Sequence, residues 1–433
     1  MRNADGPHVI VVGAGFAGVA CAKRLAGDPR VRVTVLERTG YHQFQPLLYQ
    51  VATAELASAD VTFGLDRLFG KHPTVEARTA EVVAADPASA SVTLAGGDTL
   101  SGDVLVLAAG SQPNYFGTPG AAEHAFPLYC VDDAQRVRSR VLQLFADASA
   151  DPRLARNGAL TFVIVGGGPT GVETAGALAE LVHNVMPLRY DRSAVAGAQI
   201  ILVDHGGALL APFSESAHAY AAAQLRERGV QLRLGTSVTE VGPDHVTLHD
   251  GTTIRTHLTV WGGGVTAAAL AAGAGLTQGR GGRIDVLPDL TVPGLPHVYA
   301  LGDFANTPNG NEPALPGLGS VALQAGRWAA GNILADLTGD GRRPFHYHDK
   351  GIMAMIGRDA AVAEVGEHRH ELHGPVAFAA WLGVHAQLLG NTDAELKAFV
   401  DWAEEFYLRP HHRSAQLLDP SKIDTPRINW SGT

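Results

Sequence analysis

The chain has 433 residues, of which 46% are hydrophobic and 51 are glycine. This length allows two or three domains that each bury a core. A formal net charge of −10 argues against nucleic acid as the main partner. The two cysteines, Cys21 and Cys130, stand in unrelated contexts. They argue against a disulfide framework and favour a reducing, cytoplasmic compartment.

Targeting and membrane-spanning signals are not recognised in this sequence. No secretory signal peptide is expected at the N-terminus. The most apolar stretch, 374–392, lacks charges but contains His385 and Gln387 and is rich in alanine and glycine. We expect it to form a buried or interfacial helix and not a membrane span.

Two glycine-rich loops are the most informative feature of the chain. The first follows the apolar run 8–12 and contains Gly13, Gly15 and Gly18. The second follows the apolar run 160–165 and contains Gly166, Gly168 and Gly171. Each run is rich in β-branched residues and each loop opens an alanine-rich stretch, which is the strand–loop–helix context of a dinucleotide-binding site. Such loops hold a pyrophosphate at a helix N-terminus, so the pattern predicts two bound dinucleotides.

An acidic residue ends the strand that follows each loop. Glu37 lies 24 residues after Gly13, where a carboxylate can accept both ribose hydroxyls of an adenosine. Asp204 ends the run 199–203, and its distance of 38 residues from Gly166 is long for a simple crossover. Either carboxylate could instead be an ordinary strand-end residue. If Asp204 does bind a ribose, it favours NADH over NADPH, because it repels a 2′-phosphate.

Three more apolar runs end in small residues. The run 103–109 closes on Gly110, and the run 258–261 enters a glycine triplet that includes Gly263. The run 297–301 ends in Gly302 and Asp303. An aspartate at the carboxyl end of such a strand can hydrogen-bond the ribityl or pyrophosphate part of a flavin, although alone it would be an ordinary turn residue.

Five strings of this sequence resemble the type II, non-proton-pumping NADH:quinone oxidoreductases. They are GAGFAG, GYHQFQPLLYQVAT, VIVGGGPTGVETAGALAE, YALGDFA and DKGIMAMIGRDAAV. The resemblance implies an α/β fold with two Rossmann-like dinucleotide-binding domains and a C-terminal region with helices. Residues 1–113 and 285–345 would bind FAD, and residues 114–284 would bind NADH. Residues 346–433 would associate with a membrane or form a dimer interface.

The resemblance also implies roles for individual residues. Glu173 would face the flavin and quinone and handle protons or position substrates, unless it is only stabilised by the helix dipole. Gln324 matches the second glutamine of the family's AQxAxQxG quinone motif, whereas Ser320 replaces the first. Lys350 would lie near the flavin or the quinone tunnel, or else on the surface. Further cofactor contacts would come from Phe16, Arg38, Gln45, Pro46, Leu47, Ala109, Gly110, Gly263 and Ala322.

The C-terminal region departs from the family pattern. Phe378, Trp381, Leu382, His385, Leu388 and Leu389 form one helical stripe, a pattern that is more often core than membrane-facing. Where the family is basic, this chain has Asp393, Glu395, Asp401, Glu404 and Glu405. Anionic lipid repels such residues, so we expect weak, salt-insensitive contact with the inner face of the membrane through the apolar stripe. His385 is interpreted as a packed helix residue, and no metal site is expected.

Three functional hypotheses follow. Sulfide:quinone and disulfide reductases need a cysteine pair beside the flavin, which this chain lacks. The leading hypothesis is therefore FAD-dependent transfer of hydride from NADH and of two electrons to a quinone. The second is a soluble flavoprotein that acts on a small aromatic, quinone-like metabolite, and the third is a flavin-bearing redox sensor.

Overall fold

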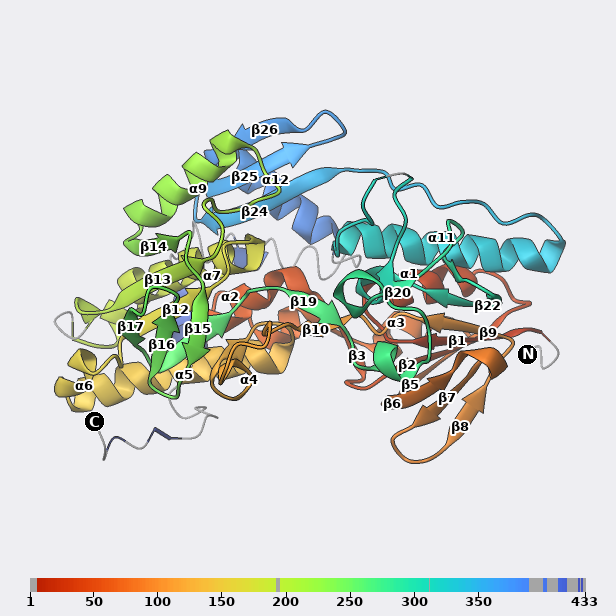
Figure 1. The fold of residues 1–433 in the computed structure, drawn as a ribbon, viewed down its shortest axis with the longest axis horizontal. Coiled ribbons are helices and arrows are strands. Elements are labelled where there is room, and N and C mark those ends of the chain that lie inside the picture. The colour runs from red at the N-terminus through yellow and green to blue at the C-terminus, as the bar shows by residue number, and fades with distance from the viewer. Residues whose placement is uncertain are drawn as a thin grey trace. The chain divides into compact units, whose positions relative to one another are not determined.

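The computed structural model describes residues 6–191, 195–310, 312–388, 400–402, 412–418, 427–428 and 430. The chain divides into two compact units, and each has an α/β architecture (Figure 1). The first unit comprises Met1–Gln43, Thr62–Gln112 and Val265–His348. The second comprises Phe44–Val61, Pro113–Gly264 and Asp349–Thr433. The chain thus leaves the first unit and returns to it twice before it leaves for the last time after His348, and the C-terminal region belongs to the second unit.

The first unit is built on a six-stranded sheet in the order β21-β22-β9-β1-β2-β5. All neighbours in it are parallel except the edge pair β21–β22. The strands are β1 (His8–Val12), β2 (Arg32–Glu37), β5 (Val75–Thr79), β9 (Val104–Leu107), β21 (Thr291–Val292) and β22 (Leu295–Ala300). The central strands consist almost entirely of buried Val, Ile and Leu, as expected for a parallel sheet that is covered on both faces.

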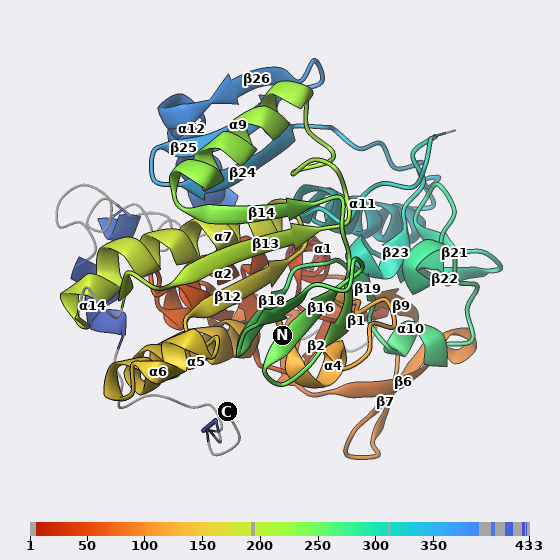
Figure 2. The same cartoon turned by 60° about the vertical axis from the view of Figure 1, so that its left-hand side comes forward.

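Helix α1 (Phe16–Leu25) packs along α11 (Gly319–Thr338), and Figures 1 and 2 show the two helices side by side. Their close approach requires small residues, because a Cβ on Gly326 would collide with the carbonyl oxygen of Ala17. The other elements of this unit are β3 (Tyr41–Gln43), β4 (Thr62–Gly64), α3 (Leu65–Phe69), β6 (Val82–Asp86), η3 (Pro87–Ser89), β7 (Ser91–Leu94), β8 (Thr99–Ser101), β10 (Ser111–Pro113), β19 (Val265–Ala267), α10 (Leu270–Gly273), η6 (Arg280–Gly282), β20 (Ile284–Asp285), η7 (Gly302–Phe304) and β23 (Ala305–Asn306).

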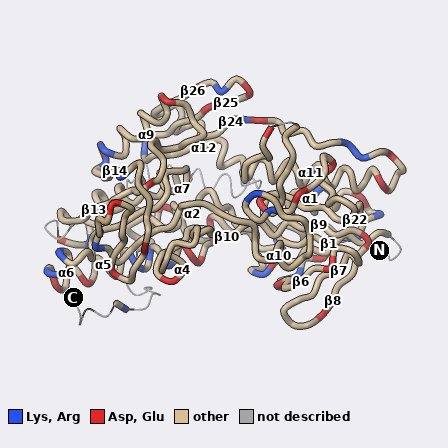
Figure 3. Tube along the Cα trace, in the orientation of Figure 1, with Lys and Arg blue, Asp and Glu red and all other residues tan. Residues whose placement is uncertain are grey.

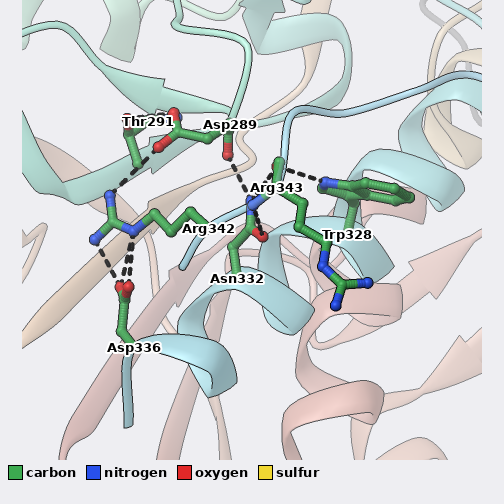
Figure 4. A network of polar contacts seen from close by, with 7 residues as sticks. All are labelled: Asp289, Thr291, Trp328, Asn332, Asp336, Arg342 and Arg343. Carbon is green, nitrogen blue, oxygen red and sulfur yellow. Dashed lines mark hydrogen bonds and ion pairs between the residues drawn. The ribbon is translucent and has the colours of Figure 1, made fainter. Parts of the chain in front are cut away.

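The segment after α11 is tied back along that helix by side-chain hydrogen bonds (Figure 4). The amide of Asn332 donates to the carbonyl of Arg343 and accepts from its N–H, both at 3.0 Å. The indole of Trp328 donates to the same carbonyl at 3.0 Å. One turn further, Arg342 pairs with Asp336 at 2.6 Å. These contacts hold the segment that leads from α11 toward the second unit.

The second unit is built on a five-stranded parallel sheet in the order β11-β18-β12-β13-β14. Its strands are β11 (Phe126–Pro127), β12 (Thr161–Val165), β13 (Gln199–Asp204), β14 (Val230–Leu234) and β18 (Leu258–Trp261). The remaining elements before the C-terminal region are η1 (Gln45–Leu47), α2 (Leu48–Ala52), η2 (Ser58–Asp60), α4 (Ala121–His124), α5 (Val131–Ala150), α6 (Arg153–Arg156), α7 (Pro169–Glu180), η4 (Leu181–Val185), η5 (Met186–Leu188), α9 (Glu215–Glu227), β15 (Val238–Val241), β16 (His245–Leu248) and β17 (Thr253–Arg255).

The C-terminal region adds a small antiparallel sheet and a helix to this unit. They are β24 (Gly351–Gly357), β25 (Ala360–Val365), β26 (His370–His373), α12 (Gly374–Leu388) and the short α14 (His412–Leu417). Helix α7 packs against the five-stranded sheet and also against β24, as Figure 2 shows, and α12 packs against β24 and β25. The contact between α7 and β24 is close, because a Cβ on Gly176 would collide with the carbonyl oxygen of Ile356. This packing places residues of α7, β24 and α12 around one buried point.

Candidate active site

The first glycine loop lies between β1 and the N-terminus of α1. Gly13 has a φ of +97°, and a Cβ there would collide with the carbonyl oxygen of Ala108. A Cβ on Gly18 would collide with the carbonyl oxygen of Gly13. At Gly15, in contrast, a Cβ would meet no atom within 4 Å. The loop is therefore tightly packed on the protein side and open at the helix N-terminus, as a bound pyrophosphate requires.

The second glycine loop, between β12 and α7, repeats this geometry in the other unit. Gly166 has a φ of +112°, and a Cβ there would collide with the carbonyl oxygen of Gly262. A Cβ on Gly171 would collide with the carbonyl oxygen of Gly166, whereas one on Gly168 would meet nothing within 4 Å. Each unit thus has a complete cradle for a dinucleotide.

The two strand-end carboxylates make matching hydrogen bonds. Glu37 accepts from the N–H of Ala14 at 2.8 Å, and Asp204 accepts from the N–H of Gly167 at 2.8 Å. Both donors are the residue after the first glycine of their loop. The long spacing before Asp204 is occupied in part by η4 and η5, which continue α7 before the chain enters β13. Asp204 therefore occupies the same structural position in its unit as Glu37 does in the other.

Asp303 lies in η7, directly after β22, and accepts a hydrogen bond from the hydroxyl of Ser111 at 3.0 Å. Its neighbour Gly302 faces both helices of the first unit. A Cβ on Gly302 would lie 3.3 Å from the Cβ atoms of Ala17 and Ala322. The small side chain of Ala322 therefore allows α11 to approach the strand end that carries Asp303.

The other residues expected to contact a cofactor fall in both units. Phe16 opens α1 and makes an edge-on contact with His42 at 5.3 Å, and Arg38 is exposed. In the first unit, Ala109 and Gly110 follow β9. In the second unit, η1 contains Gln45, Pro46 and Leu47, and Gly263 follows β18.

Glu173 lies in α7 of the second unit, and its position corrects one expectation. From the sequence, stabilisation of this carboxylate by the helix dipole alone was an alternative to a role in the reaction. However, Glu173 is the fifth residue of α7, and the first turn contains no acidic residue. Because the dipole effect falls off within that turn, it does not explain a carboxylate here. The side chain is 8% exposed and accepts a hydrogen bond from the N–H of Met355 at 3.2 Å.

Burial raises the pKa of Glu173 from 4.5 to about 8. The N–H of Met355 and the indole of Trp381 oppose this shift because both favour the charged form. A carboxyl group with this pKa can be protonated or ionised near neutral pH. Groups of this kind are typical of proton-transfer sites, although structural networks also produce them.

A buried polar cluster surrounds Glu173 within the second unit. The phenol of Tyr49 donates to the sulfur of Met355 at 3.2 Å, and the amide of Gln50 donates to the phenol at 3.3 Å. The indole of Trp402 in turn donates to the side-chain amide oxygen of Gln50 at 3.0 Å. The sequence does not predict these contacts, although Tyr49 and Gln50 belong to one of the strings that resemble the family.

His385 packs inside this cluster, as the sequence analysis expected. Its ring stacks on Trp381 with a centroid distance of 3.9 Å and an interplanar angle of 19°. Its Nδ1 lies 2.9 Å from the carbonyl oxygen of Trp381, so Nδ1 carries the proton. Burial lowers the pKa of His385 to about 4 and keeps the ring neutral.

Gln324 and Ser320 lie one turn apart on α11 and both contact the segment after that helix. The amide of Gln324 donates to the carbonyl of His348 and accepts from its N–H, each at 3.0 Å. The hydroxyl of Ser320 lies 2.9 Å from that of Tyr347. In this structure, each end of the Gln324 amide thus makes one backbone hydrogen bond. Lys350, just beyond this segment, is exposed, and its carbonyl accepts a hydrogen bond from the N–H of Gly366 at 3.1 Å. Its ammonium group makes no hydrogen bond or ion pair with the described residues.

Comparison with known proteins identifies the family. The family model of the pyridine nucleotide-disulphide oxidoreductases matches residues 7–326. The type II NADH:quinone oxidoreductase Ndh of Mycobacterium tuberculosis is 35% identical over 92% of this chain and 88% of its own length. NdhA of the same organism is 35% identical over 94% of this chain and 89% of its own length. This chain belongs to the type II NADH:quinone oxidoreductase family.

Solved structures confirm the family fold. The NDH2 structure from Plasmodium falciparum in complex with NADH has a TM-score of 0.85 at 18% identity, and covers 94% of this chain and 99% of that one. The sulfide:quinone oxidoreductase of Aquifex aeolicus has a TM-score of 0.73 at 17% identity, and covers 94% of this chain and 96% of that one. The two-domain α/β arrangement expected from the sequence is therefore confirmed.

The cysteines separate this type II family member from reductases that use a cysteine pair. Both are free; Cys21 is buried in α1, whereas Cys130 caps the start of α5 in the other unit. Burial raises the pKa of Cys21 to about 12 and that of Cys130 to about 11. Neither thiol is activated, because the thiolate is the reactive form. Among the described residues, no cluster of His, Cys, Asp and Glu could hold a metal ion.

Part of the apolar stripe of α12 is buried in this family member and is therefore not available for the membrane contact that was expected through it. Phe378 and Trp381 are 1% and 0% exposed and pack in the core. The exposed large apolar residues of α12 are instead Val376 and Val384. Asp401 is buried, whereas Leu389, Asp393, Glu395, Glu404 and Glu405 lie outside the described residues.

The described surface carries both signs of charge. Figure 3 shows basic and acidic positions interspersed over both units. Within the described ranges, no helix is long and apolar enough to cross a membrane.

Proposed function

We propose that this chain transfers hydride from NADH to FAD and then two electrons from the flavin to a quinone, without pumping protons. Two observations support this function together. The chain belongs to the type II NADH:quinone oxidoreductase family, and each unit has an open glycine loop with a carboxylate in the matching position. Two such cradles fit a reaction that needs two dinucleotides at once.

The first unit is proposed to hold FAD. Its open loop at Gly15 suits the pyrophosphate, Glu37 suits the adenosine ribose, and Asp303 suits the ribityl or pyrophosphate region. The second unit is proposed to hold NADH through the loop at Gly168 and through Asp204. Bound FAD supplies the redox chemistry, since it accepts a hydride and returns electrons to an acceptor. The residues of the chain bind, orient and exchange protons.

Glu173 is the proposed proton-exchanging group. Reduction of a quinone to a quinol takes up two electrons and two protons, whereas NADH contributes only the equivalent of two electrons and one proton. One further proton must come from the protein or the solvent. Glu173 is buried and retains its proton to about pH 8 because burial raises its pKa. It can therefore donate a proton in the site and regain it from solvent.

Gln324 and Lys350 are proposed to act at the acceptor end of the site. The amide of Gln324 retains one N–H and one oxygen lone pair beyond its bonds to His348, and either could contact a quinone oxygen. Lys350 begins the string that leads into β24, and its exposed ammonium could approach a polar headgroup. Ser320 stands where the family's quinone motif has its first glutamine, and its hydroxyl lies 2.9 Å from that of Tyr347.

Contact with the membrane is proposed to be weak and peripheral, on the inner face. The burial of the α12 stripe and the interspersed surface charges support this proposal. Co-sedimentation with anionic liposomes at low and high salt tests it, and strong binding that salt abolishes would contradict it. A homodimer remains a prediction, which light scattering on the FAD-loaded protein would test.

An acceptor panel under NADH tests the proposed function. Menaquinone, ubiquinone and small naphthoquinones would be compared at equal concentration with the FAD-loaded protein. We expect rapid steady-state oxidation of NADH with at least one long-tailed quinone. Turnover restricted to small naphthoquinones would favour a role in metabolism of small aromatic compounds. Slow turnover with every acceptor would favour a redox sensor.

A further inference from the structure

Trp381 differs from the other tryptophans of the chain in one respect. Its Nε1 is buried and has no hydrogen-bond partner among the described residues. The chain has five tryptophans, and the other four each donate a hydrogen bond from the indole: Trp261 to Asn114, Trp328 to Arg343, Trp402 to Gln50 and Trp430 to Asp147. An indole N–H can only donate, and leaving a buried donor unpaired is unfavourable. We therefore expect a specific acceptor for the indole N–H of Trp381.

The carboxyl group of Glu173 is the acceptor that the cluster offers. One of its oxygens accepts the N–H of Met355 at 3.2 Å, and the indole of Trp381 lies close enough to lower the pKa of Glu173 as a donor. The ring of Trp381 is fixed by its stack on His385 and by an edge contact with Tyr49 at 6.4 Å. The donor is thus held beside the carboxyl group by packing alone.

We propose that the indole N–H of Trp381 bonds to the carboxylate of Glu173 when that carboxylate forms, and that Trp381 is a positioning residue for proton exchange. This inference rests on the proposed function. In the step concerned, the O–H bond of the Glu173 carboxyl breaks and its proton passes to the reduced acceptor. The negative charge then stays on Glu173 until a proton from solvent restores the acid. Two N–H donors, from Met355 and Trp381, stabilise this charge in the buried site.

Among the ionisable groups around Glu173, Tyr49 and His385 do not change their charge near pH 8. Tyr49 on α2 has a pKa raised well above 10 by its burial and by Glu173, so its phenol stays neutral. Glu55 follows α2 and Glu180 lies on α7, where it faces Arg228. His385 on α12 stays neutral because burial lowers its pKa to about 4. Strand β24 carries no ionisable side chain.

The pH dependence of the quinone half-reaction tests the inference in the FAD-loaded protein. Trp381→Phe keeps an aromatic ring but removes the donor. We expect the midpoint of the pH profile to rise by about one unit, since a hydrogen bond to the charged form is lost. Trp328→Phe is the matched control, because it removes an indole donor in the first unit that bonds to the carbonyl of Arg343, and its midpoint should equal that of the wild type. An unchanged midpoint in folded, FAD-loaded Trp381→Phe would overturn the inference.

A second measurement does not depend on the folding of that variant. In protein labelled with ¹⁵N-tryptophan, one of the five indole N–H resonances should move downfield as pH rises through the midpoint. Glu173→Gln should abolish this movement. If all five resonances stay fixed in the wild type, Trp381 is not the donor. If Glu173→Gln leaves the pH dependence of the quinone half-reaction unchanged, Glu173 is not the group that exchanges the proton. The NMR result and the kinetic result therefore test the role of Trp381 and the role of Glu173 separately.

Discussion

The carboxylate of Asp204 accepts a hydrogen bond from the N–H of Gly167 at 2.8 Å, which fixes it beside the glycine loop of the second unit. A second oxygen of Asp204 accepts from the N–H of Gly206 at 2.9 Å. Because the carboxylate is held at the loop by two backbone donors, it lies where the adenosine ribose of a dinucleotide binds in this type of unit.

This position predicts a preference for NADH over NADPH. The negative charge of Asp204 repels a 2′-phosphate, so Asp204→Asn should reduce the ratio of kcat/KM for NADH to that for NADPH by about tenfold. Asp250→Asn, in an exposed turn of the same unit, is the control and should leave the ratio unchanged. Equal kcat/KM values for both nucleotides in the wild type would contradict the assignment.

Glu173→Gln should slow the acceptor half-reaction selectively. The substitution keeps the size of the side chain but removes its exchangeable proton, so flavin reoxidation by quinone should fall by about 100-fold. Reduction of the flavin by NADH should stay within about twofold. Stopped-flow absorbance of the flavin measures both steps. Glu180→Gln is the matched control, since Glu180 is a second carboxyl on α7 whose pKa burial raises. Equal slowing of both half-reactions would point to a structural role.

Glu173 should also make stability depend on pH. Its pKa is about 8 in the folded protein and near 4.5 when unfolded, so the unfolded chain binds fewer protons between these values. The contribution of Glu173 to the free energy of unfolding is fully present below about pH 4.5 and is lost as the pH rises toward 8. Glu173→Gln removes the decline, and at pH 9 it should be more stable than the wild type by on the order of 3 kcal/mol. Thermal unfolding at several pH values measures the difference. If Glu173→Gln were less stable than the wild type at pH 9, the ionised carboxylate of Glu173 would stabilise the folded protein, which would contradict this prediction.

Gln324→Met tests whether this residue anchors the segment after α11. The substitution retains the volume of the side chain and removes both hydrogen bonds to His348, so the first unit should lose roughly 1–2 kcal/mol of stability. KM for NADH should not change. Limited proteolysis around residues 345–348 and thermal unfolding would reveal the loss. A higher KM for quinone in this variant would support the proposed contact of Gln324 with the acceptor, whereas an unchanged melting temperature would show that Gln324 does not anchor the segment.

The dinucleotide sites could be predicted from sequence because their signals are local. Gly13, Gly166 and the residues that follow them lie within single strand–loop–helix units. The spacing of Asp204 from Gly166 does not by itself predict a position at the second glycine loop. The parallel pairing of β13 with β12 brings the end of β13, and with it Asp204, to that loop.

The surroundings of Glu173 could not be predicted in the same way. Met355, Trp381 and Trp402 are between 182 and 229 positions away in the sequence and meet only through the packing of α7, β24 and the C-terminal region. Likewise, the stripe of α12 has the same pattern whether it faces a membrane or a core. Its burial follows from the presence of β24 and β25, which the helical period cannot reveal.

Anaerobic single-turnover kinetics of the FAD-loaded protein test the central claim most directly. NADH would be mixed with the enzyme in the absence of oxygen, and a long-tailed quinone would be added after the flavin is reduced. The account predicts that the flavin absorbance is lost with one NADH per flavin, and that one quinone restores it at a rate at least equal to steady-state turnover. A flavin that NADH reduces but quinone cannot reoxidise at that rate would contradict the claim.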